Sequence, residues 1–533
     1  MNYMKKNILK ISIAIAVFAG SITSCKKILD LTPTNDITAD QVYSTAAGYK
    51  AAFAKVYGSF ALTGNSGPAG NGDIQGIDEG TSDFLRLFWN AQELSTDEAI
   101  DNSSWGDAGL HDFHNMNWTS SNAMLTGLYD RSAYQITLCN EFIRQCSDAN
   151  LSTRGITGAS ADTIRKYIPE ARFLRAFQYW ALMDVFANPP FADETNALGS
   201  FMPKQIKRAD LFNYIGSELR AISSTLPAPK SNEYGRADQA AANALLARMY
   251  LNAAVYTGTV KYDSAIIYSK KVIDAGYSLE TNYNWLMRAD NYKCTNEFIL
   301  TINYDGQKTQ NWGGTTYIIN AGCNSDMGAA MMGVSGWGGN RTTKNLPNLF
   351  PNYTGTPDQR SQFFTSNHTI DITDRSSWTS GFAVSKFRNV TRAGALGSDA
   401  TQSDVDFPLF RLAEQYLIYA EAMLRGGTGG DAATALSYIN KLRDRAYGNT
   451  TGEIGASSLT TDFILDERAR ELYWEGFRRT DLIRYNKFVE STYLWPWKAG
   501  IAGGAGVDAH YKIYPIPSTD INSNTNLVQN TGY

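Results

Sequence analysis

The sequence predicts a mainly α-helical protein in which pairs of packed helices carry long loops. Two observations predict this class. Several stretches show the apolar period of amphipathic or buried helices, and they occur as neighbouring pairs joined by glycine-containing turns. Between the pairs lie long segments rich in Gly, Asn, Thr, Ser and Trp, with few periodic runs. The pairing is typical of TPR-like scaffolds, but the irregular spacing between pairs does not fit a regular solenoid.

The composition is that of a globular protein. The 533 residues are 43% hydrophobic and 19% charged, with a net charge of −4. This is enough apolar material for a large core, and the acidic balance offers no basic footprint for nucleic acid. We therefore expect no nucleic-acid partner.

The first 24 residues have the features of an export signal. Lys5, Lys6 and Lys10 precede about ten apolar residues, a run too short to span a bilayer. The stretch "SITSC" then resembles a lipoprotein cleavage box that ends at Cys25. We predict that residues 1–24 are removed and that Cys25 carries the lipid that anchors the mature chain. The alternative is a secreted protein that is cut nearby and has an incidental cysteine.

Residues 25–533 are predicted to form one domain. The stretch 169–186 predicts a helix that begins at Pro169 and stops before Asn188. Residues 235–256 are Ala-rich and apolar all round, which predicts a helix buried closely among others, followed by a partner at 262–277.

A second predicted pair covers 408–427 and 431–448. The run 466–485 predicts a salt-bridged helix packed on the core, with pairs Glu467/Arg470, Glu475/Arg479 and Asp481/Arg484 at helical spacing.

Two loop-rich insertions, at about 61–120 and 278–405, interrupt this scaffold. The second contains a short strand-like piece, "EFILTINY", and two tryptophans between glycines: Trp312 in "NWGGTTY" and Trp337 in "GVSGWGGN". Long ordered loops on a rigid scaffold are where binding sites tend to lie. These surroundings predict that both tryptophans are substantially exposed.

Exposed tryptophans edged by polar side chains predict a site for a neutral glycan. A pyranose ring presents a face of C–H groups that stacks on an aromatic ring, and its hydroxyls bind planar polar side chains. Glycines let the backbone approach the sugar. Trp312, beside Asn311, and Trp337 both fit this pattern, and the alternative is a buried structural role for each.

Four stretches resemble hallmarks of the SusD/RagB family of surface glycan-binding lipoproteins. In order they are "EARFLRAFQYWALMDVF", "RLAEQYLIYAEAML", "DERARELYWEGFRRTDLIRYNKF" and "YPIPSTDINSNTNLVQNTGY", and with the lipoprotein start they cover nearly the whole chain. The resemblance implies a non-catalytic protein, lipid-anchored and exposed at the outer membrane, that partners a SusC-like TonB-dependent transporter. Shorter stretches such as "NWGGTTY" and "TYLWPWKAG" look closest to starch-binding members, which implies an α-glucan or maltooligosaccharide ligand.

The resemblance also assigns residues. It implies that Trp312 and Trp337 form part of an aromatic arc for curved α-glucan, and that Arg86 and Asp78 match polar positions that contact sugar.

One departure from the family pattern affects the glycan. Where starch binders have a further tryptophan, the directly aligned residue here is Asp101, and Trp105 lies four residues later. We predict that Trp105 takes that place, with Asp107 as a hydroxyl acceptor. If Trp105 only packs its loop, the arc loses a wall and the glycan differs.

Two other classes of protein are less well supported. A glycoside hydrolase needs two opposed carboxylates, which Asp97, Glu98 and Asp101 could supply, but a helix-start cap in "STDEAI" is the favoured explanation, since close pairs arise by chance among 52 Asp and Glu residues. A TPR-like protein-binding scaffold would have an apolar groove between helices and no tryptophan-bearing glycine loops.

The sequence predicts no cofactor and no catalytic residue. His111 and His114 have a spacing that suits zinc, but no third ligand follows nearby. A structural calcium is compatible with the loop carboxylates, yet nothing places it, so any metal site is unknown. Four further cysteines, too few for a disulfide scaffold in so long a chain, are expected to be buried thiols: Cys139, Cys146, Cys294 and Cys323.

Overall fold

The computed structural model describes residues 38–68, 70–196, 199 and 202–533. The chain divides into two compact units, one that ends at Ala52 and one from Phe53 to Tyr533. The predicted signal and Cys25 lie outside the described residues, and a single domain over 25–533 stays a prediction. Helices α3 (Ala39–Val42) and α4 (Ala46–Gly58) open the described chain.

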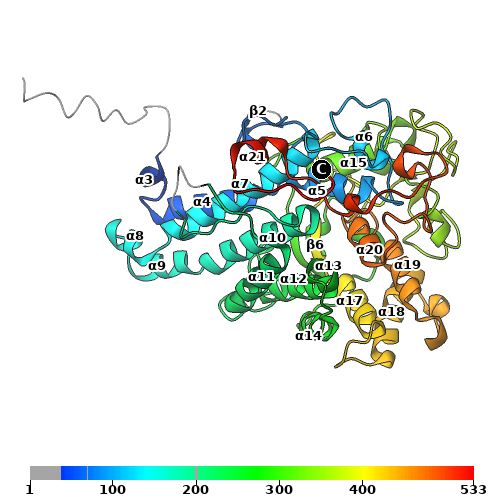
Figure 1. Cartoon of the computed structure of the whole chain (residues 1–533). Helices are drawn as coiled ribbons and strands as arrows, with labels where there is room; N and C mark the ends of the chain where they lie inside the picture. Colours follow the sequence, from blue (N-terminus) through cyan, green and yellow to red (C-terminus); the bar gives the residue numbers. More distant parts are fainter. Residues whose placement is uncertain (1–37, 69, 197–198, 200–201) are drawn as a thin grey trace, which may run out of the picture. The chain divides into compact units, whose positions relative to one another are not determined.

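Paired long helices form the scaffold of the second unit (Figure 1). Helix α7 packs on α10, α10 on α11, α12 on α14, α14 on α17, and α17 on both α18 and α19. The predicted mainly α, helix-pair class is therefore confirmed. The scaffold helices are α7 (Ala123–Gln145), α8 (Asp148–Thr153), α9 (Gly158–Arg165), α10 (Ile168–Phe186), α11 (Arg208–Ile222), α12 (Gln239–Leu251), α13 (Ala253–Thr257), α14 (Tyr262–Ile273), α17 (Leu412–Leu424), α18 (Ala432–Tyr447), α19 (Thr461–Leu472) and α20 (Arg478–Arg484).

The alanines of α12 explain why this helix can sit at the centre of the stack. Ala240, Ala241, Ala244 and Ala247 are fully buried, and their small side chains let neighbouring helices approach closely. The helix begins where Asp238 accepts a hydrogen bond from the Ala241 amide at 3.0 Å. The predicted helix over 235–256 is thus two helices, α12 and α13.

Three short antiparallel strand pairs complete the regular structure of the described residues. Strand β3, within the predicted "EFILTINY", pairs with β6, and both are buried throughout. Because β6 takes the first residues of the predicted 408–427 helix, α17 begins only at Leu412. The strands are β1 (Gly64–Ser66), β2 (Gly70–Gly72), β3 (Phe298–Ile302), β4 (Phe363–Phe364), β5 (Ala383–Val384) and β6 (Phe407–Arg411).

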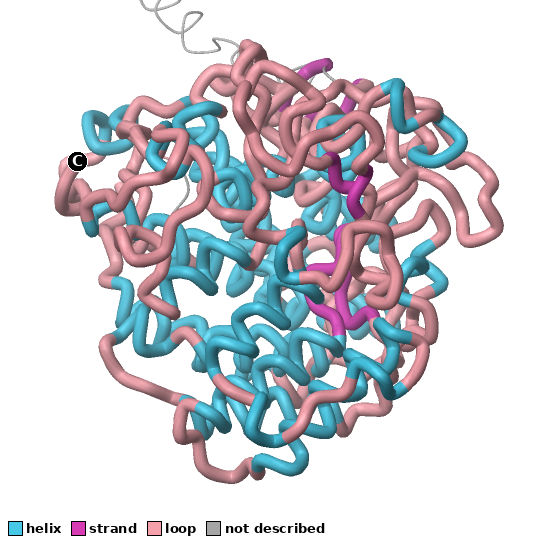
Figure 2. The backbone as a smooth tube through the Cα atoms, turned by 90° about the vertical axis from the view of Figure 1, so that its right-hand side faces the viewer, coloured by secondary structure: helices cyan, strands magenta, loops and turns pink. Residues whose placement is uncertain are grey.

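The two insertions are mostly loops, and loops make up much of the upper half of the view in Figure 2. They also contain buried helices that their composition did not predict. Residues 84–94 form α5 and a five-residue π-helix, all buried, because their aromatic and leucine side chains fill the core. The helices of the insertions and of the carboxyl end are α5 (Phe84–Trp89), α6 (His111–Asn115), α15 (Gly314–Ala321), α16 (Ala329–Met332) and α21 (Ser518–Ser523).

The run 466–485 is two helices and not the single predicted one. Between α19 and α20 the backbone turns at Trp474 (φ 64°) and Gly476 (φ 82°), conformations that end a right-handed helix. The pairs Glu467/Arg470 and Asp481/Arg484 form at 2.7 Å as predicted.

The predicted Glu475/Arg479 pair does not form, because the turn separates the two side chains. Glu475 instead binds Arg411 at 2.7 Å, and Arg479 donates to the carbonyl of Lys512 at 2.8 Å.

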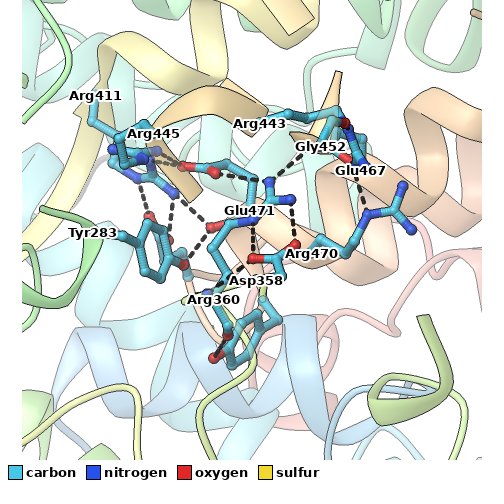
Figure 3. Close-up of polar contacts among 12 residues, drawn as sticks. Tyr283, Asp358, Arg360, Arg411, Arg443, Arg445, Gly452, Glu467, Arg470 and Glu471 are labelled. Atoms are coloured by element: carbon cyan, nitrogen blue, oxygen red, sulfur yellow. Dashed lines mark hydrogen bonds and ion pairs between the residues drawn. The ribbon is translucent and has the colours of Figure 1, made fainter. Parts of the chain in front are cut away.

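Buried ion pairs join this helix turn to distant parts of the chain (Figure 3). Arg411, at the end of β6, binds Glu471 at 2.7 Å and Glu297 at 3.0 Å. Arg360, from the 278–405 insertion, binds Glu467 at 2.7 Å and Glu471 at 3.2 Å. All five side chains are at most 1% exposed.

The network keeps its carboxylates ionised. Burial alone would raise the pKa of Glu471, but Arg445, Arg411 and Arg360 lower it well below its usual range. The same competition lowers the pKa of Glu467 to about 2. The ion pairs therefore fix the insertion to the helices as long as these groups stay charged.

We expect Glu471→Ala to destabilise the protein by about 3–5 kcal/mol, because it leaves buried guanidinium groups without a counter-ion. A carboxylate whose folded pKa is depressed stabilises above its unfolded pKa of about 4.3, and this stabilisation disappears as the pH falls through the folded value. The difference in free energy of unfolding between wild type and variant should therefore narrow from pH 5 towards pH 2.

Denaturant unfolding across this pH range measures the difference. The control is Glu453→Ala, which removes an exposed glutamate and should change stability by less than about 0.5 kcal/mol. If the difference in free energy of unfolding between wild type and Glu471→Ala did not vary with pH, this would contradict the ion-pair interpretation.

Candidate functional site

Three tryptophans from the two insertions lie in a row. Trp337 is in the middle, with its ring centroid 6.1 Å from that of Trp312 and 6.5 Å from that of Trp105, at interplanar angles of 57° and 54°. All three are partly exposed, less than predicted for Trp312 and Trp337, because the rings lean on one another. Within the described chain, none of their indole N–H groups donates a hydrogen bond to another residue. The row thus offers tilted aromatic faces and free donors.

The position of Trp312 is set by buried groups beneath it. The side chain of Asn311 donates to the carbonyl of Ala61 and accepts from the amide of Gly313, both at 2.5 Å. Asp83 accepts from the amide of Gly314 at 2.7 Å, and a Cβ atom at Gly313 would lie 2.2 Å from the Cβ of Asp83. The glycine after Trp312 is required by this close packing.

Asp83 is itself a joint between two helices. It caps α5 by accepting from the amide of Arg86 at 2.9 Å, while it also holds the start of α15. Burial raises the pKa of Asp83 to about 6, although its backbone hydrogen bonds oppose the shift.

The loop of Trp337 follows the end of α15. The Trp337 amide donates to the carbonyl of Asn320 at 2.6 Å, and the Gly338 amide to that of Cys323 at 2.8 Å. Gly336 has φ 78°, and a Cβ atom there would lie 2.4 Å from the same Cys323 carbonyl oxygen. Only glycine fits this turn.

The loop of Trp105 is attached to the loop of Trp337. Asn102 donates to the carbonyl of Gly338 at 3.1 Å. A Cβ atom at Gly339 would lie 2.1 Å from Cζ2 of Trp105, so the indole packs directly on the glycine backbone. The structure thus places Trp105 beside Trp337, while a contact of Trp105 with glycan stays a prediction.

Asp101 explains why Trp105 can take this place. It is fully buried, binds Arg375 at 3.2 Å and contacts Nδ1 of His111. The other ring nitrogen of His111 lies 2.8 Å from the carbonyl oxygen of Trp105. The hydrogen bond to Asp101 is the main cause that raises the pKa of His111. Asp101 therefore points inward and fixes the loop that presents Trp105.

The predicted polar residues surround the same row. Asp78 is exposed, and its Oδ1 accepts from the amide and hydroxyl of Thr81 at 2.9 and 3.0 Å. A Cβ atom at Gly80 would lie 3.4 Å from Oδ1 of Asp78 and 3.7 Å from Cδ1 of Trp312, so both side chains lie close to this glycine. Asp107 is 31% exposed and pairs with Arg86.

Arg86 is only 4% exposed, so most of its guanidinium faces protein. It lies 4.2 Å above the ring of Tyr317 and donates to the carbonyl of Gly80 at 3.3 Å. Direct contact of Arg86 with sugar remains a prediction from resemblance; in the structure, Arg86 orients Asp107. The structure brings all six predicted residues into one cluster: Asp78, Arg86, Trp105, Asp107, Trp312 and Trp337.

Tyr317 was not predicted as part of the site. It is fully buried under Arg86 and Trp105, accepts a hydrogen bond from Asn340 at 3.1 Å, and has its pKa raised to about 12 by burial. It forms the floor of the row. The sequence did contain a signal for Tyr317, since this tyrosine is the last residue of the stretch "NWGGTTY" that pointed to Trp312.

The carboxylates considered for hydrolysis are not opposed across a cleft. Asp97 is buried and forms two 2.7 Å hydrogen bonds with Arg478, and Glu98 is buried against the amide of Trp474 at 3.2 Å. Burial raises the pKa of Glu98 to about 7.

The remaining candidates have structural contacts. Both ring nitrogens of His114 face backbone carbonyls, those of Leu94 and Pro496, at 3.0 and 3.1 Å. No group of three or more His, Cys, Asp or Glu that could hold a metal occurs in the described part of the chain. Four cysteines are buried free thiols, as predicted: Cys139, Cys146, Cys294 and Cys323.

Comparison with known proteins agrees with the family resemblance of the sequence. The chain is 36% identical over 568 aligned residues to the starch-binding protein SusD of Bacteroides thetaiotaomicron, covering 97% of both chains. Residues 352–533 match the model of the SusD family, and residues 85–251 match the model described as starch-binding associating with outer membrane. The chain belongs to the SusD family.

Solved structures share the SusD-like fold. The surface glycan-binding protein A of Bacteroides thetaiotaomicron, in complex with laminarihexaose, superposes with a TM-score of 0.69 at 21% identity and covers 91% of this chain and 99% of its own. A laminarin-binding SusD-like protein gives 0.69 at 23% identity, with the same coverage. At these identities the likeness concerns the fold. Among the described residues, no helix has the length and apolar character needed to cross a membrane.

The glycine under Trp105 offers a test of how the site is built. We expect Gly339→Ala to displace the Trp105 ring, because the added Cβ would overlap it. Tryptophan fluorescence should shift and glycan affinity should fall. Gly106→Ala, in the same loop but with open space around its Cβ position, should leave both unchanged. Equal effects of the two variants would show that Trp105 does not pack as described.

Proposed function

We propose that this SusD-family protein is a non-catalytic, lipid-anchored cell-surface protein that captures starch-type α-glucan and passes it to a TonB-dependent outer-membrane transporter. The observation that carries the proposal is the row of Trp105, Trp337 and Trp312. Adjacent rings tilted by 54° to 57° follow a curved ligand better than a flat one, and the free indole N–H groups can donate to sugar hydroxyls.

The polar edge supports the same ligand class. Asp78 is exposed near Trp312, and Asp107 is partly exposed and paired with Arg86, so two carboxylates accompany the row. Hydroxyl groups of a neutral sugar can donate to them. The 36% identity to a starch-binding relative supports an α-glucan.

A second candidate ligand is a β-glucan. Two solved structures of the same fold are titled as laminarin-binding or as holding laminarihexaose, so the fold accepts such chains in other members. A different glycan is the main alternative within the same role.

Alanine variants of the three tryptophans distinguish a role in glycan binding from a role in folding. Trp312→Ala, Trp337→Ala and Trp105→Ala should each weaken maltoheptaose binding by about thirtyfold or more, because truncating a stacking side chain costs 2 kcal/mol or more. Each ring is partly exposed, so the melting temperature should shift by only a few degrees.

Calorimetry with maltoheptaose and laminarihexaose measures the effect. Trp378→Ala, a partly exposed tryptophan outside the row whose indole N–H donates to Asp326 at 3.1 Å, is the matched control and should keep wild-type affinity. A large loss of stability would show that the row is core. Binding of laminarihexaose alone would replace the α-glucan by a β-glucan, and release of reducing ends would contradict a non-catalytic role.

The lipid anchor is tested by fractionating cells that express a variant of Cys25. Cys25→Ala should move the protein from the membrane fraction to the soluble fraction and abolish incorporation of labelled fatty acid, because the acyl chains are the proposed attachment. Cys146→Ala, which removes a buried thiol, should leave both unchanged. Membrane association of unacylated Cys25→Ala would contradict the proposed anchor.

A further inference from the structure

A second hollow, of about 470 Å³, lies in the 278–405 insertion, apart from the tryptophan row. Its wall differs from that row because it combines three arginines with one tryptophan and two asparagines. The lining residues that matter are Asn282, Asn284, Trp285, Arg288, Arg388 and Arg392.

Two of these arginines are held side by side. Arg288 and Arg388 face each other in a parallel backbone bridge, and the amide of Arg388 donates to the carbonyl of Met287 at 3.1 Å. Residues paired in this way extend their side chains to the same side. Each Nε is anchored to a backbone carbonyl, that of Asn284 at 2.8 Å and that of Ser385 at 2.6 Å.

Neither guanidinium has a carboxylate within ion-pair distance in the described chain. The terminal nitrogens of Arg288 and Nη1 of Arg388 donate to no described residue. This contrasts with Arg411 and Arg360, which are buried among several carboxylates each. Burial, and then the charge of Arg288, lower the pKa of Arg388 to about 10, and burial also lowers the pKa of Arg288. Two like charges, on Arg288 and Arg388, therefore repel each other at the wall of this pocket.

The other lining groups complete a recognition surface. The Arg392 guanidinium lies 4.8 Å from the Trp285 ring centroid, and its nearest carboxylate, Glu280, is 3.9 Å away. Trp285 is partly exposed, so it gives the cavity an aromatic wall. The amides of Asn282 and Asn284 add neutral donors and acceptors.

We propose that this pocket binds an oxyanion carried on a sugar: a sulfate, phosphate or carboxylate substituent. A planar guanidinium matches the oxygen geometry of these anions, and two adjacent guanidinium groups supply parallel donors to one anion. An ammonium-bearing or neutral ligand would leave the repulsion between Arg288 and Arg388 unrelieved. The aromatic wall suits the ring that bears the charge.

The chain connects the pocket to the tryptophan row. Met331 lines the pocket and Trp337 follows six residues later, a separation of at most about 22 Å along an extended chain. The row and the pocket are thus close enough for one glycan to span both. This extension rests on the proposed function, whereas anion binding in the pocket is independent of it. The ligand class would then include glucans with charged substituents.

Thermal shift and calorimetry on the full chain test the pocket, with inorganic phosphate, glucose 6-phosphate and glucose as probes. Phosphate and glucose 6-phosphate should raise the wild-type melting temperature and glucose should not, because a ligand that binds only the folded state stabilises it. Arg388→Gln and Arg288→Gln should each weaken glucose 6-phosphate binding at least about tenfold, the equivalent of one charge-assisted hydrogen bond.

The control variant is Arg165→Gln, which removes an exposed guanidinium from α9. Phosphate also stabilises proteins by exclusion from their surface, so the decisive quantity is the difference between this control and the pocket variants. Without anion, Arg388→Gln loses the hydrogen bonds to Ser385 but also relieves the repulsion with Arg288, so its melting temperature should stay within a few degrees of wild type, which also shows that the variant folds.

The outcomes separate this proposal from the proposed function. Trp312→Ala should keep glucose 6-phosphate binding, and Arg288→Gln should keep maltoheptaose binding. Equal anion binding by the pocket variants and Arg165→Gln would overturn the pocket. Binding of inorganic phosphate with exclusion of glucose 6-phosphate would overturn a sugar-borne ligand.

Discussion

The buried ion pairs around Glu471 are the constraint on which the rest of the structure depends. They bring together β6, the turn after α19 and the long insertion, which are far apart in sequence. Burying these charges is costly, so the arrangement is stable only if every guanidinium finds its carboxylates. The loops of the insertion gain their fixed geometry from this requirement, since apolar contacts alone are non-directional.

The tryptophan row depends on a similar but smaller set of polar joints. Asp83 links α5 to α15, Asn102 links the two tryptophan loops, and Asp101 holds His111 against the Trp105 carbonyl. Each joint is buried or partly buried, and each lies beneath a ring. The rings are therefore oriented before any sugar arrives, which reduces the conformational entropy that binding would cost.

Features set by local periodicity could be predicted from the sequence, and features set by long-range packing could not. Helix α10 matches the predicted 169–186 because the prolines at its start and just after its end are local signals. The prediction of one helix over 466–485 was wrong, since the chain turns at Trp474 and Glu475 pairs with Arg411 on a distant element. The i, i+4 spacing identifies charge pairs within one helix and gives no information about partners on other elements.

The site shows the same division. The glycines around Trp312 indicated an unusual loop, but the close approach of Asp83 to Gly313 could not be read from the sequence. Nothing local distinguishes the inward Asp101 from the outward Trp105, because the difference arises from Arg375 and His111. The assignment of Trp105 required comparison with a family pattern, and the unneutralised pair Arg288 and Arg388 required the structure.

The link between Asn102 and Gly338 joins residues 236 positions apart, and the one between Asn311 and Ala61 spans 250. Contacts so distant in sequence form late, because a long loop must close before they contribute any stability. A folding chain consequently cannot assemble the tryptophan row until both insertions are present and the helices between them have packed. The recognition surface is thus among the last parts of the molecule to exist, and a chain that carries it has already completed its fold.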